Sequence, residues 1–233
     1  MLVEHVNACS LMPNKVHPAH SYASLALCIV DSVYSIGVRY TGVVNTVARF
    51  AKSYGWNVTG RDRYSKNRGQ FDLEAFVSIF NGFSSEQAAD GIFGNRQRTS
   101  TKNGILKAEA CNRFAQAMLD VGIKDFPILG HPALLQAEAN VLCIEGQRSG
   151  ISWDYFRLLA GDDDLIKPDR RVIEFVAKSQ GKDISEISPR LAAVLVKSAA
   201  RVLKVSNHEW TASRLDFAVW SHVSKYDPKD KAP

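Results

Sequence analysis

The sequence predicts an all-α fold, and two observations carry the prediction. Apolar residues recur at three- and four-residue steps through the second half of the chain, as helices with one buried face require. No sustained alternation of apolar and polar residues indicates a β-strand. The 233 residues, 45% hydrophobic and 23% charged, have the composition of an ordinary globular protein and can bury a sizeable core.

Five helices of the second half are predicted from such repeats. The repeats are Leu134, Ala137, Val141 and Ile144; Tyr155, Phe156, Leu158 and Leu159; Val172, Phe175 and Val176; Leu191, Ala192, Leu195, Ala199 and Val202; and Leu215, Ala218 and Val219. The first of these helices is expected to end at Gly146. Asp169 can cap the third, and the pair Ser188-Pro189 begins the fourth.

Two segments are expected to lie outside the helices. Trp56–Gln70 is polar, basic and punctuated by glycine, which is typical of a surface loop. Tyr226–Pro233 is charged and proline-rich, and we expect it to fray.

Charge and hydropathy narrow the classes of partner. A net charge of +5 and a pI near 9.0 permit a polyanionic partner without requiring one. The longest apolar run, Leu25–Val30, is too short to cross a bilayer, and the N-terminus M-L-V-E-H lacks the basic region of a leader. We therefore expect a cytoplasmic protein that does not bind membranes.

The cysteines and histidines give no metal pattern. Cys9, Cys28, Cys111 and Cys143 are scattered, with no C-x-x-C pair, so neither a zinc site nor an iron–sulfur cluster is expected. His17 and His20 form an isolated H-x-x-H without acids nearby. The sequence predicts no metal and no cofactor.

The most informative segment is Gly146–Asp169. It reads G-Q-R-S-G, then the apolar pattern of a short helix, a loop, and K-P-D before the next helix. Glycines at both ends of a tight hairpin can adopt positive φ and bring backbone amides close to a ligand. Beside a helix N-terminus, such amides can bind a phosphate.

This arrangement resembles the signature of the helix-hairpin-helix DNA glycosylase superfamily. In those enzymes a hairpin, a helix and then a motif holding the catalytic aspartate follow one another, and here K-P-D-R-R-V supplies Asp169. The stretch Ser24–Tyr40 is similar to the first core helix of that superfamily and the loop after it. Leu215–Trp220 is similar to its closing helix.

The resemblance implies one domain over residues 1–233, built of two helical subdomains around a base-binding cleft. The N- and C-terminal helices would form one subdomain, and roughly residues 45–150 the other. It implies a monomeric enzyme that binds duplex DNA through its phosphates and flips out a damaged or modified base. Hydrolysis of the N-glycosidic bond would leave an abasic site. A modified base of foreign or phage DNA, and so a role in antiviral defence, is one expectation.

The chain departs from the superfamily pattern in three places. Arg148 replaces the second glycine of the hairpin, and Arg170 and Arg171 replace a threonine and a histidine after the aspartate. The lysine that forms a Schiff base in bifunctional members aligns with Gly150. A monofunctional enzyme is therefore expected, with Lys167, beside Asp169, as the one lysine that could change this.

The resemblance assigns residues to three roles. Asp169 is expected to be the catalytic residue, because a carboxylate at a helix N-terminus stays ionised and can stabilise the cationic sugar. The expected DNA contacts are Arg39, Gly146, Gln147, Arg148, Ser149, Gly150, Lys167, Arg170 and Arg171. The expected base pocket contains Tyr34, Ser35, Trp153, Asp154 and Tyr155.

Other interpretations of the same residues stay open. Gly146–Gly150 could be an ordinary turn and Asp169 only a helix cap, as in a non-catalytic helix-hairpin-helix DNA-binding protein or a helical interaction protein. The rival acids are Glu145, Asp154 and Asp162–Asp164. Asp31, inside an apolar helix, is expected to bond to backbone or an arginine, or to read a base edge. The donor-rich stretch Asn95–Gly104 is either a second DNA contact or a solvated connection.

Overall fold

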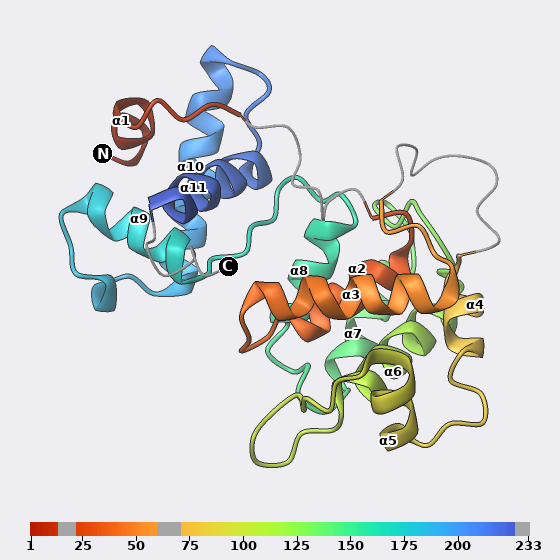
Figure 1. Ribbon diagram of the computed structural model, residues 1–233. Coiled ribbons are helices and arrows are strands. Elements are labelled where there is room, and N and C mark those ends of the chain that lie inside the picture. The colour runs from red at the N-terminus through yellow and green to blue at the C-terminus, as the bar shows by residue number, and fades with distance from the viewer. Residues whose placement is uncertain (14–21, 60–70, 227–233) are drawn as a thin grey trace. The chain divides into compact units, whose positions relative to one another are not determined.

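The computed structural model describes residues 1–13, 22–59 and 71–226, and helices are the main secondary structure of these residues (Figure 1). Eleven α-helices, one π-helical turn and one 3₁₀ turn lie within them. The described ranges contain no strand, only two isolated bridges, Tyr22–Thr59 and Arg98–Leu106. The predicted all-α class is confirmed.

The helices divide into two compact units, of which the first joins both ends of the chain. Unit 1 comprises residues 1–17 and 162–233, and unit 2 comprises residues 18–161. The sequence prediction placed the second subdomain over roughly residues 45–150, whereas unit 2 also includes the helix before residue 45. His17, His20, most of the loop Trp56–Gln70 and residues 227–233 lie outside the described residues.

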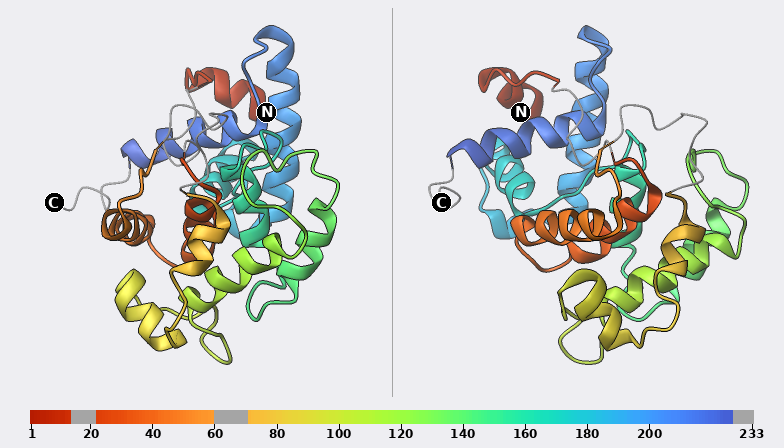
Figure 2. Two further views of the ribbon diagram at one scale, coloured as in Figure 1. Left: turned by 90° about the vertical axis from the view of Figure 1, so that its right-hand side faces the viewer. Right: turned by 45° about the vertical axis from the view of Figure 1, so that its right-hand side comes forward.

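Unit 1 is a small bundle with its own core. Its helices are α1 (Leu2–Ala8), α9 (Arg170–Gln180), α10 (Pro189–Ser206) and α11 (Ala212–Tyr226), with a 3₁₀ turn at Ile184–Glu186. Figures 1 and 2 show these helices gathered together, α1 at the red end of the colour bar and the others at its blue end. The core includes Val6, Val172, Phe175, Val196 and Leu215.

The helix starts of unit 1 follow from local sequence. Asp169 caps α9, and the Ser188 side chain accepts the amide hydrogen of Leu191 at the start of α10, where Pro189 takes the first helical position. Proline suits that position because its fixed φ is helical and its missing amide hydrogen has no helical partner there. The predicted starts of both helices are therefore confirmed.

Unit 2 is built around α2 (Leu25–Tyr34), whose ten residues are all buried. It packs against α6 (Lys107–Leu119) and α8 (Ile151–Leu159). The other helices are α3 (Tyr40–Tyr54), α4 (Leu73–Ser78), α5 (Ser85–Ala88), the π-helical turn Ala89–Phe93 and α7 (Leu134–Leu142). Burying all sides of α2 explains why its sequence is apolar almost without interruption.

Two boundaries differ from the prediction. The helix expected to reach Gly146 ends at Leu142, and Ile144 is buried from within a turn rather than from the helix. Trp56, placed by the sequence in a surface loop, is 8% exposed and lies edge-on to Phe50, with their ring centroids 5.1 Å apart. In both cases the apolar side chain is held in the core although its backbone has left the helix.

Candidate functional site

The glycine-bounded segment forms two consecutive turns between α7 and α8. The Gln147 amide donates to the Ile144 carbonyl at 2.9 Å, and the Gly150 amide donates to the Gln147 carbonyl at 3.0 Å. Gly146 and Gly150 both have positive φ, +83° and +73°. Gly150 is also the N-cap of α8. The backbone thus takes the turn that the glycines predict, and the first amide of α8, that of Ile151, donates to the Ser149 hydroxyl at 3.5 Å.

A second loop lies against this turn. Thr99 belongs to the stretch Asn95–Gly104, and its hydroxyl donates to the Glu145 carbonyl at 3.1 Å. A Cβ atom at Gly146 would collide with the Thr99 side chain. Glycine is therefore required at position 146 for two reasons: its φ is positive, and the neighbouring loop leaves no room for a side chain. The structure brings together the two unit 2 segments that the sequence suggested as DNA contacts.

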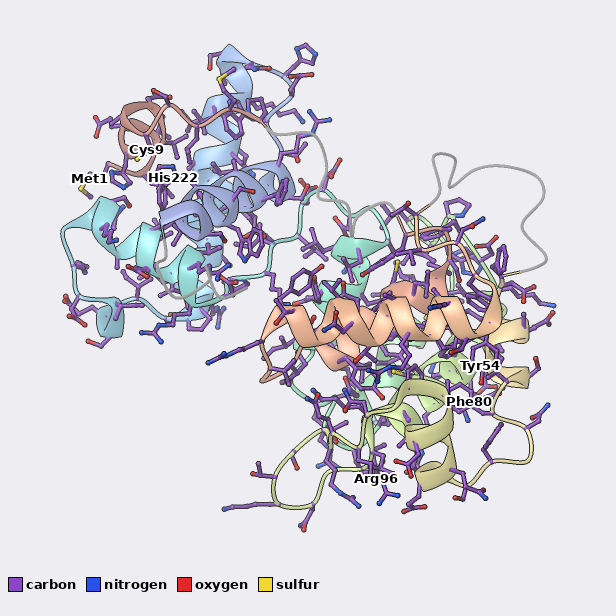
Figure 3. All side chains as sticks on the ribbon, in the orientation of Figure 1. Met1, Cys9, Tyr54, Phe80, Arg96 and His222 are labelled. Carbon is purple, nitrogen blue, oxygen red and sulfur yellow. The ribbon has the colours of Figure 1, made fainter. Side chains whose placement is uncertain are left out.

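The Asn95–Gly104 loop is closed by its own hydrogen bonds. The Thr99 amide donates to the Ile105 carbonyl at 2.9 Å, and the Arg98 guanidinium donates to the Gly104 carbonyl at 2.9 Å. Arg96, labelled in Figure 3, is paired with Asp90 through a 2.7 Å hydrogen bond. Two of the basic side chains of this loop thus have partners within the protein.

The side chains of the turn separate into two kinds. Arg148 and Ser149 are exposed, as side chains that reach a phosphate must be. Gln147, predicted as a DNA contact, is instead buried, and its amide oxygen accepts the hydroxyl hydrogen of Ser152. Its side chain therefore holds the turn against α8, and its amide and carbonyl are both hydrogen-bonded within the turn, so its predicted DNA contact is not supported. Arg39, at the start of α3, is exposed.

Most residues of the predicted base pocket lie in the core of unit 2. Trp153 is 1% exposed and stacks on Phe114 with centroids 5.8 Å apart. Tyr34 is 1% exposed and lies 5.3 Å from the Phe93 ring. Ser35 and Tyr155 are also buried, whereas Asp154 is exposed. The resemblance assigned these aromatic rings to a base pocket, but in the structure they are packed against other side chains.

Two of those buried rings keep a polar atom without a partner. The Tyr34 hydroxyl and the Trp153 indole nitrogen have no hydrogen-bond partner among the residues described. Burial also raises the pKa of the Tyr34 hydroxyl far above its ordinary value, so the hydroxyl stays protonated. Both side chains retain an unused donor inside unit 2.

Asp31, the acid inside α2, is fully buried and heavily hydrogen-bonded. It accepts the Tyr22 hydroxyl at 2.8 Å, the Ser35 hydroxyl at 2.7 Å and the Tyr40 hydroxyl at 3.4 Å. Tyr40 in turn shares a side-chain hydrogen bond with Tyr155. The sequence predicted a backbone or arginine partner, but hydroxyl groups take that role. Asp31 and two of the predicted pocket residues thus form one structural network.

Lys107 is a buried cation that the sequence analysis did not single out. Its ammonium group donates to the carbonyls of Tyr34 and Ile36, at 3.1 and 2.8 Å, and to the Gln97 side chain at 3.4 Å. Burial lowers its pKa to about 8. The lysine therefore ties the end of α2 to the start of α6 and to the Asn95–Gly104 loop.

In unit 1, Asp169 occupies the N-cap of α9. Its Oδ1 accepts the backbone amides of Arg171 and Val172 at 2.9 and 3.1 Å. Both bonds fall on one oxygen, so within the described part of the chain the hydrogen-bonding capacity of Oδ2 is left for a ligand. The side chain is partly exposed. A fixed, partly exposed carboxylate at a helix N-terminus can stabilise a developing positive charge.

The basic residues around Asp169 have different environments. Arg170 is exposed. Arg171 is instead turned onto α11, where it donates to the Ser224 hydroxyl at 2.6 Å and lies 5.1 Å from the Trp220 ring. Its partners within unit 1 explain its position without a phosphate. Lys167 is partly exposed, and its carbonyl accepts the Asp169 amide at 2.7 Å.

The rival acids have structural partners. Glu145 pairs with Arg113 at 2.8 Å. Asp163 accepts the Ser213 hydroxyl at 2.8 Å and so ties its loop to the start of α11. Asp162 accepts the Asp164 amide at 3.2 Å. These contacts are those of caps and surface pairs, and they account for Glu145, Asp162 and Asp163 within the protein.

A second carboxyl group lies near Asp169, and the sequence gave no signal for it. Asp216, on α11, is 8% exposed, and its Oδ2 accepts the Lys167 amide at 3.3 Å. Its Oδ1 has no hydrogen-bond partner among the described residues. Burial and the negative charge of Asp169 raise the pKa of Asp216 well above its ordinary value. Unit 1 thus holds two carboxyl groups in contrasting environments.

The described ranges contain neither a metal-binding cluster nor a membrane-spanning helix. No group of three His, Cys, Asp or Glu side chains there could hold a metal ion. The four cysteines, all in these ranges, form no disulfide; Cys28 and Cys111 are buried and Cys143 is exposed. No described helix is long and apolar enough to cross a bilayer.

One family matches the chain, over residues 1–224: a domain of unknown function, DUF8548. The protein belongs to the DUF8548 family. No curated protein and no solved structure matches the chain.

Proposed function

We propose that this DUF8548 protein is a monofunctional DNA glycosylase that hydrolyses the N-glycosidic bond of a flipped, damaged or modified base. The observation that carries the proposal is the environment of Asp169. Its carboxylate is fixed by two backbone amides on Oδ1, is partly exposed, and lies in the K-P-D segment that resembles the glycosylase signature. The turn with Arg148 and Ser149 exposed supplies a surface for DNA phosphates.

The proposed reaction needs one negative charge at a fixed place. As the bond between the sugar C1′ and the base nitrogen breaks, the electron pair leaves with the base and positive charge develops on the sugar. The Asp169 carboxylate stabilises that charge, as carboxylates do in glycoside hydrolysis. A water molecule adds to C1′ and loses a proton, while the departing base gains one. An abasic site and a free base result.

The residue that aligns with the Schiff-base lysine of the bifunctional relatives supports hydrolysis without strand cleavage. β-Elimination in the bifunctional relatives needs an amine that forms a Schiff base with the sugar. The aligned position is Gly150, where the backbone has positive φ and caps α8. Lys167 is the nearest lysine in sequence to Asp169. The expected product is an intact abasic strand.

Asp169→Asn is the decisive variant. Asparagine still caps a helix but carries no charge, so base release should fall by at least about 100-fold while DNA affinity and thermal stability stay nearly unchanged. Asp164→Asn, at an exposed acid of the same loop, is the matched control. Bases released from natural and heavily modified phage DNAs would be identified by mass spectrometry, and strands analysed with and without alkali after borohydride trapping.

Three outcomes would contradict parts of this proposal. Base release by Asp169→Asn at the rate of the unmodified protein would remove Asp169 from the chemistry. Strand breaks without alkali, with a trapped adduct lost in Lys167→Ala, would overturn the monofunctional assignment. DNA binding without release of any base would favour the second candidate, a non-catalytic DNA-binding protein, which the ordinary cap geometry of Asp169 also fits.

A further inference from the structure

Asp216, in unit 1, is a buried carboxyl group with few hydrogen-bond partners among the described residues. It lies on α11, 49 residues from its hydrogen-bond partner, the Lys167 amide. Only 8% of the residue is exposed, and Oδ1 is inaccessible to solvent and has no hydrogen-bond partner in the described ranges. A buried carboxyl oxygen without a partner is unfavourable, so such an arrangement is usually retained for a role other than stability.

The hydrogen bond from the Lys167 amide places Asp216 beside the segment Lys167–Asp169. Lys167 is followed by Pro168 and Asp169, and the Asp169 amide donates back to the Lys167 carbonyl at 2.7 Å. Both backbone groups of Lys167 are therefore hydrogen-bonded. Its amide donates to Asp216, and its carbonyl accepts the Asp169 amide. Fixing Lys167 fixes the backbone that carries the Asp169 side chain.

The protonation of the Asp216 carboxyl group depends on its burial and on the charged groups around it. Burial is the largest influence and Asp169 the next, and both raise its pKa, while the amide and the charge of Lys167 act in the opposite direction. From α9, Arg171 is directed to Ser224 and Trp220, further along α11. The packed helix α10 contains no acid, and its cations Arg190, Lys197, Arg201 and Lys204 make no ion pair with Asp216 in the described structure. These surroundings therefore favour the protonated, neutral form of the Asp216 carboxyl group over the ionised form.

We propose that Asp216 is a positioning residue of the catalytic site, and that its buried carboxyl group anchors the Lys167–Asp169 segment that carries the catalytic carboxylate. The catalytic role of Asp169 rests on the proposed function, whereas the anchoring of the Lys167–Asp169 segment by Asp216 does not. As a neutral acid, Asp216 accepts the Lys167 amide without placing a second negative charge beside Asp169. Ionised, it would be a buried anion near another anion, which opposes the folded arrangement of the segment.

Asparagine is a close mimic of the neutral acid. In Asp216→Asn the amide oxygen can accept from Lys167, and the amide nitrogen takes the place of the protonated oxygen. Single-turnover base release at pH 7 should therefore stay within about threefold of the unmodified protein. At alkaline pH the unmodified protein should lose activity as Asp216 ionises, whereas Asp216→Asn should keep it.

Protein stability gives a readout that needs no substrate. An acid whose folded-state pKa is raised makes unfolding easier as pH rises from about 4, where a free aspartate titrates, to its folded-state pKa. The melting temperature of Asp216→Asn should therefore rise relative to the unmodified protein across this interval. Asp164→Asn, an exposed acid of the loop before α9, should show no such trend. In the unmodified protein, infrared spectroscopy at pH 7 should show one protonated carboxyl group that is missing from Asp216→Asn.

The outcomes separate this inference from the proposed function. Asp216→Asn as inactive at pH 7 as Asp169→Asn, yet folded, would mean that Asp216 donates its proton to the base and would overturn the positioning role. An ionised Asp216 at pH 7, or parallel stability curves, would overturn the neutral anchor. If no variant and no DNA yields a free base, the proposed function fails, but the stability and infrared results still decide the anchor. If Asp216→Asn does not fold, the protonated-carboxyl band in the infrared spectrum of the unmodified protein tests whether Asp216 is neutral.

Discussion

The two units each bury an aspartate, and they treat it in opposite ways. In unit 2, Asp31 is fully buried and receives hydroxyl groups from Tyr22, Ser35 and Tyr40. In unit 1, Asp216 receives one backbone amide on one oxygen, and its other oxygen has no hydrogen-bond partner in the described ranges. Both residues interrupt otherwise amphipathic or apolar helices.

The difference supports our proposal that Asp31 stabilises the fold and that Asp216 belongs to the proposed site. Hydrogen-bond partners for a buried carboxyl group recover the energy lost when it leaves water, so the Asp31 network stabilises unit 2. Asp216 has fewer such partners, and burial together with the negative charge of Asp169 raises its pKa. An incompletely bonded buried acid next to a partly exposed one is a pattern often found at functional sites.

The largest expected effect comes from replacing the buried aspartate of each unit by asparagine and comparing the two losses of stability. Asp31→Asn replaces one accepting oxygen by an amide donor and leaves hydroxyl groups of its network unmatched, so we expect a loss of about 3 kcal/mol in the free energy of unfolding. Asp216→Asn should change it by less than about 1 kcal/mol at pH 7. Urea denaturation of both variants gives the two values. A larger loss at Asp216 than at Asp31 would reverse the assignment.

The sequence predicted those parts of unit 1 that depend on neighbours along the chain. Ser188-Pro189 and Asp169 are followed directly by the amides they cap, so the starts of α9 and α10 can be read locally. Asp216 gave no such signal, because its hydrogen-bond partner is 49 residues away. Nothing in L-D-F-A-V-W distinguishes a buried acid from a solvated one.

In unit 2, helical spacing identified inward-facing residues but not what they face. Trp153 and Tyr34 were expected in a base pocket, and both are packed against other aromatic rings. A pocket and a core impose the same spacing on a helix, so the pattern cannot separate them. Lys107 and the Asp31 network depend on contacts between α2, α6 and distant loops, which no local pattern contains.

Lys107 extends the comparison to a buried cation. Lys107→Met removes the donors to two carbonyls and to the Gln97 side chain, and we expect a loss of about 2 kcal/mol at pH 7. Burial lowers the pKa of Lys107 to about 8 from 10.5. The folded protein then releases this proton before the unfolded chain does, so its unfolding free energy should rise relative to Lys107→Met between those two pH values.

This trend is opposite in sign to the one expected for Asp216, where stability falls as pH rises from about 4. The two groups can therefore be told apart in one set of melting curves recorded from acid to alkaline pH. Arg113, which pairs with Glu145 at the surface, supplies a control, because Arg113→Met should shift stability little. Parallel curves for Lys107→Met and the unmodified protein would show that burial does not perturb this lysine.

The smallest expected effect separates binding in unit 2 from chemistry in unit 1. Arg148 is exposed on the glycine-bounded turn, so Arg148→Ala should weaken duplex DNA binding a few-fold and reduce the slope of log affinity against log salt by about one. Arg171 was expected to do the same from sequence, but its contacts with Ser224 and Trp220 predict an unchanged slope in Arg171→Ala. Arg190→Ala, at an exposed arginine of α10, is the control.

Affinity would be measured with duplexes of several sequences over a range of salt concentrations, because a phosphate contact should be lost equally from all of them. Single-turnover base release at saturating DNA should remain near that of the unmodified protein in Arg148→Ala, since Asp169 and its anchor are untouched. Asp169→Asn should show the reverse, with full affinity and no release. A slope that changes in Arg171→Ala and not in Arg148→Ala would move the phosphate contact from the turn of unit 2 to the start of α9.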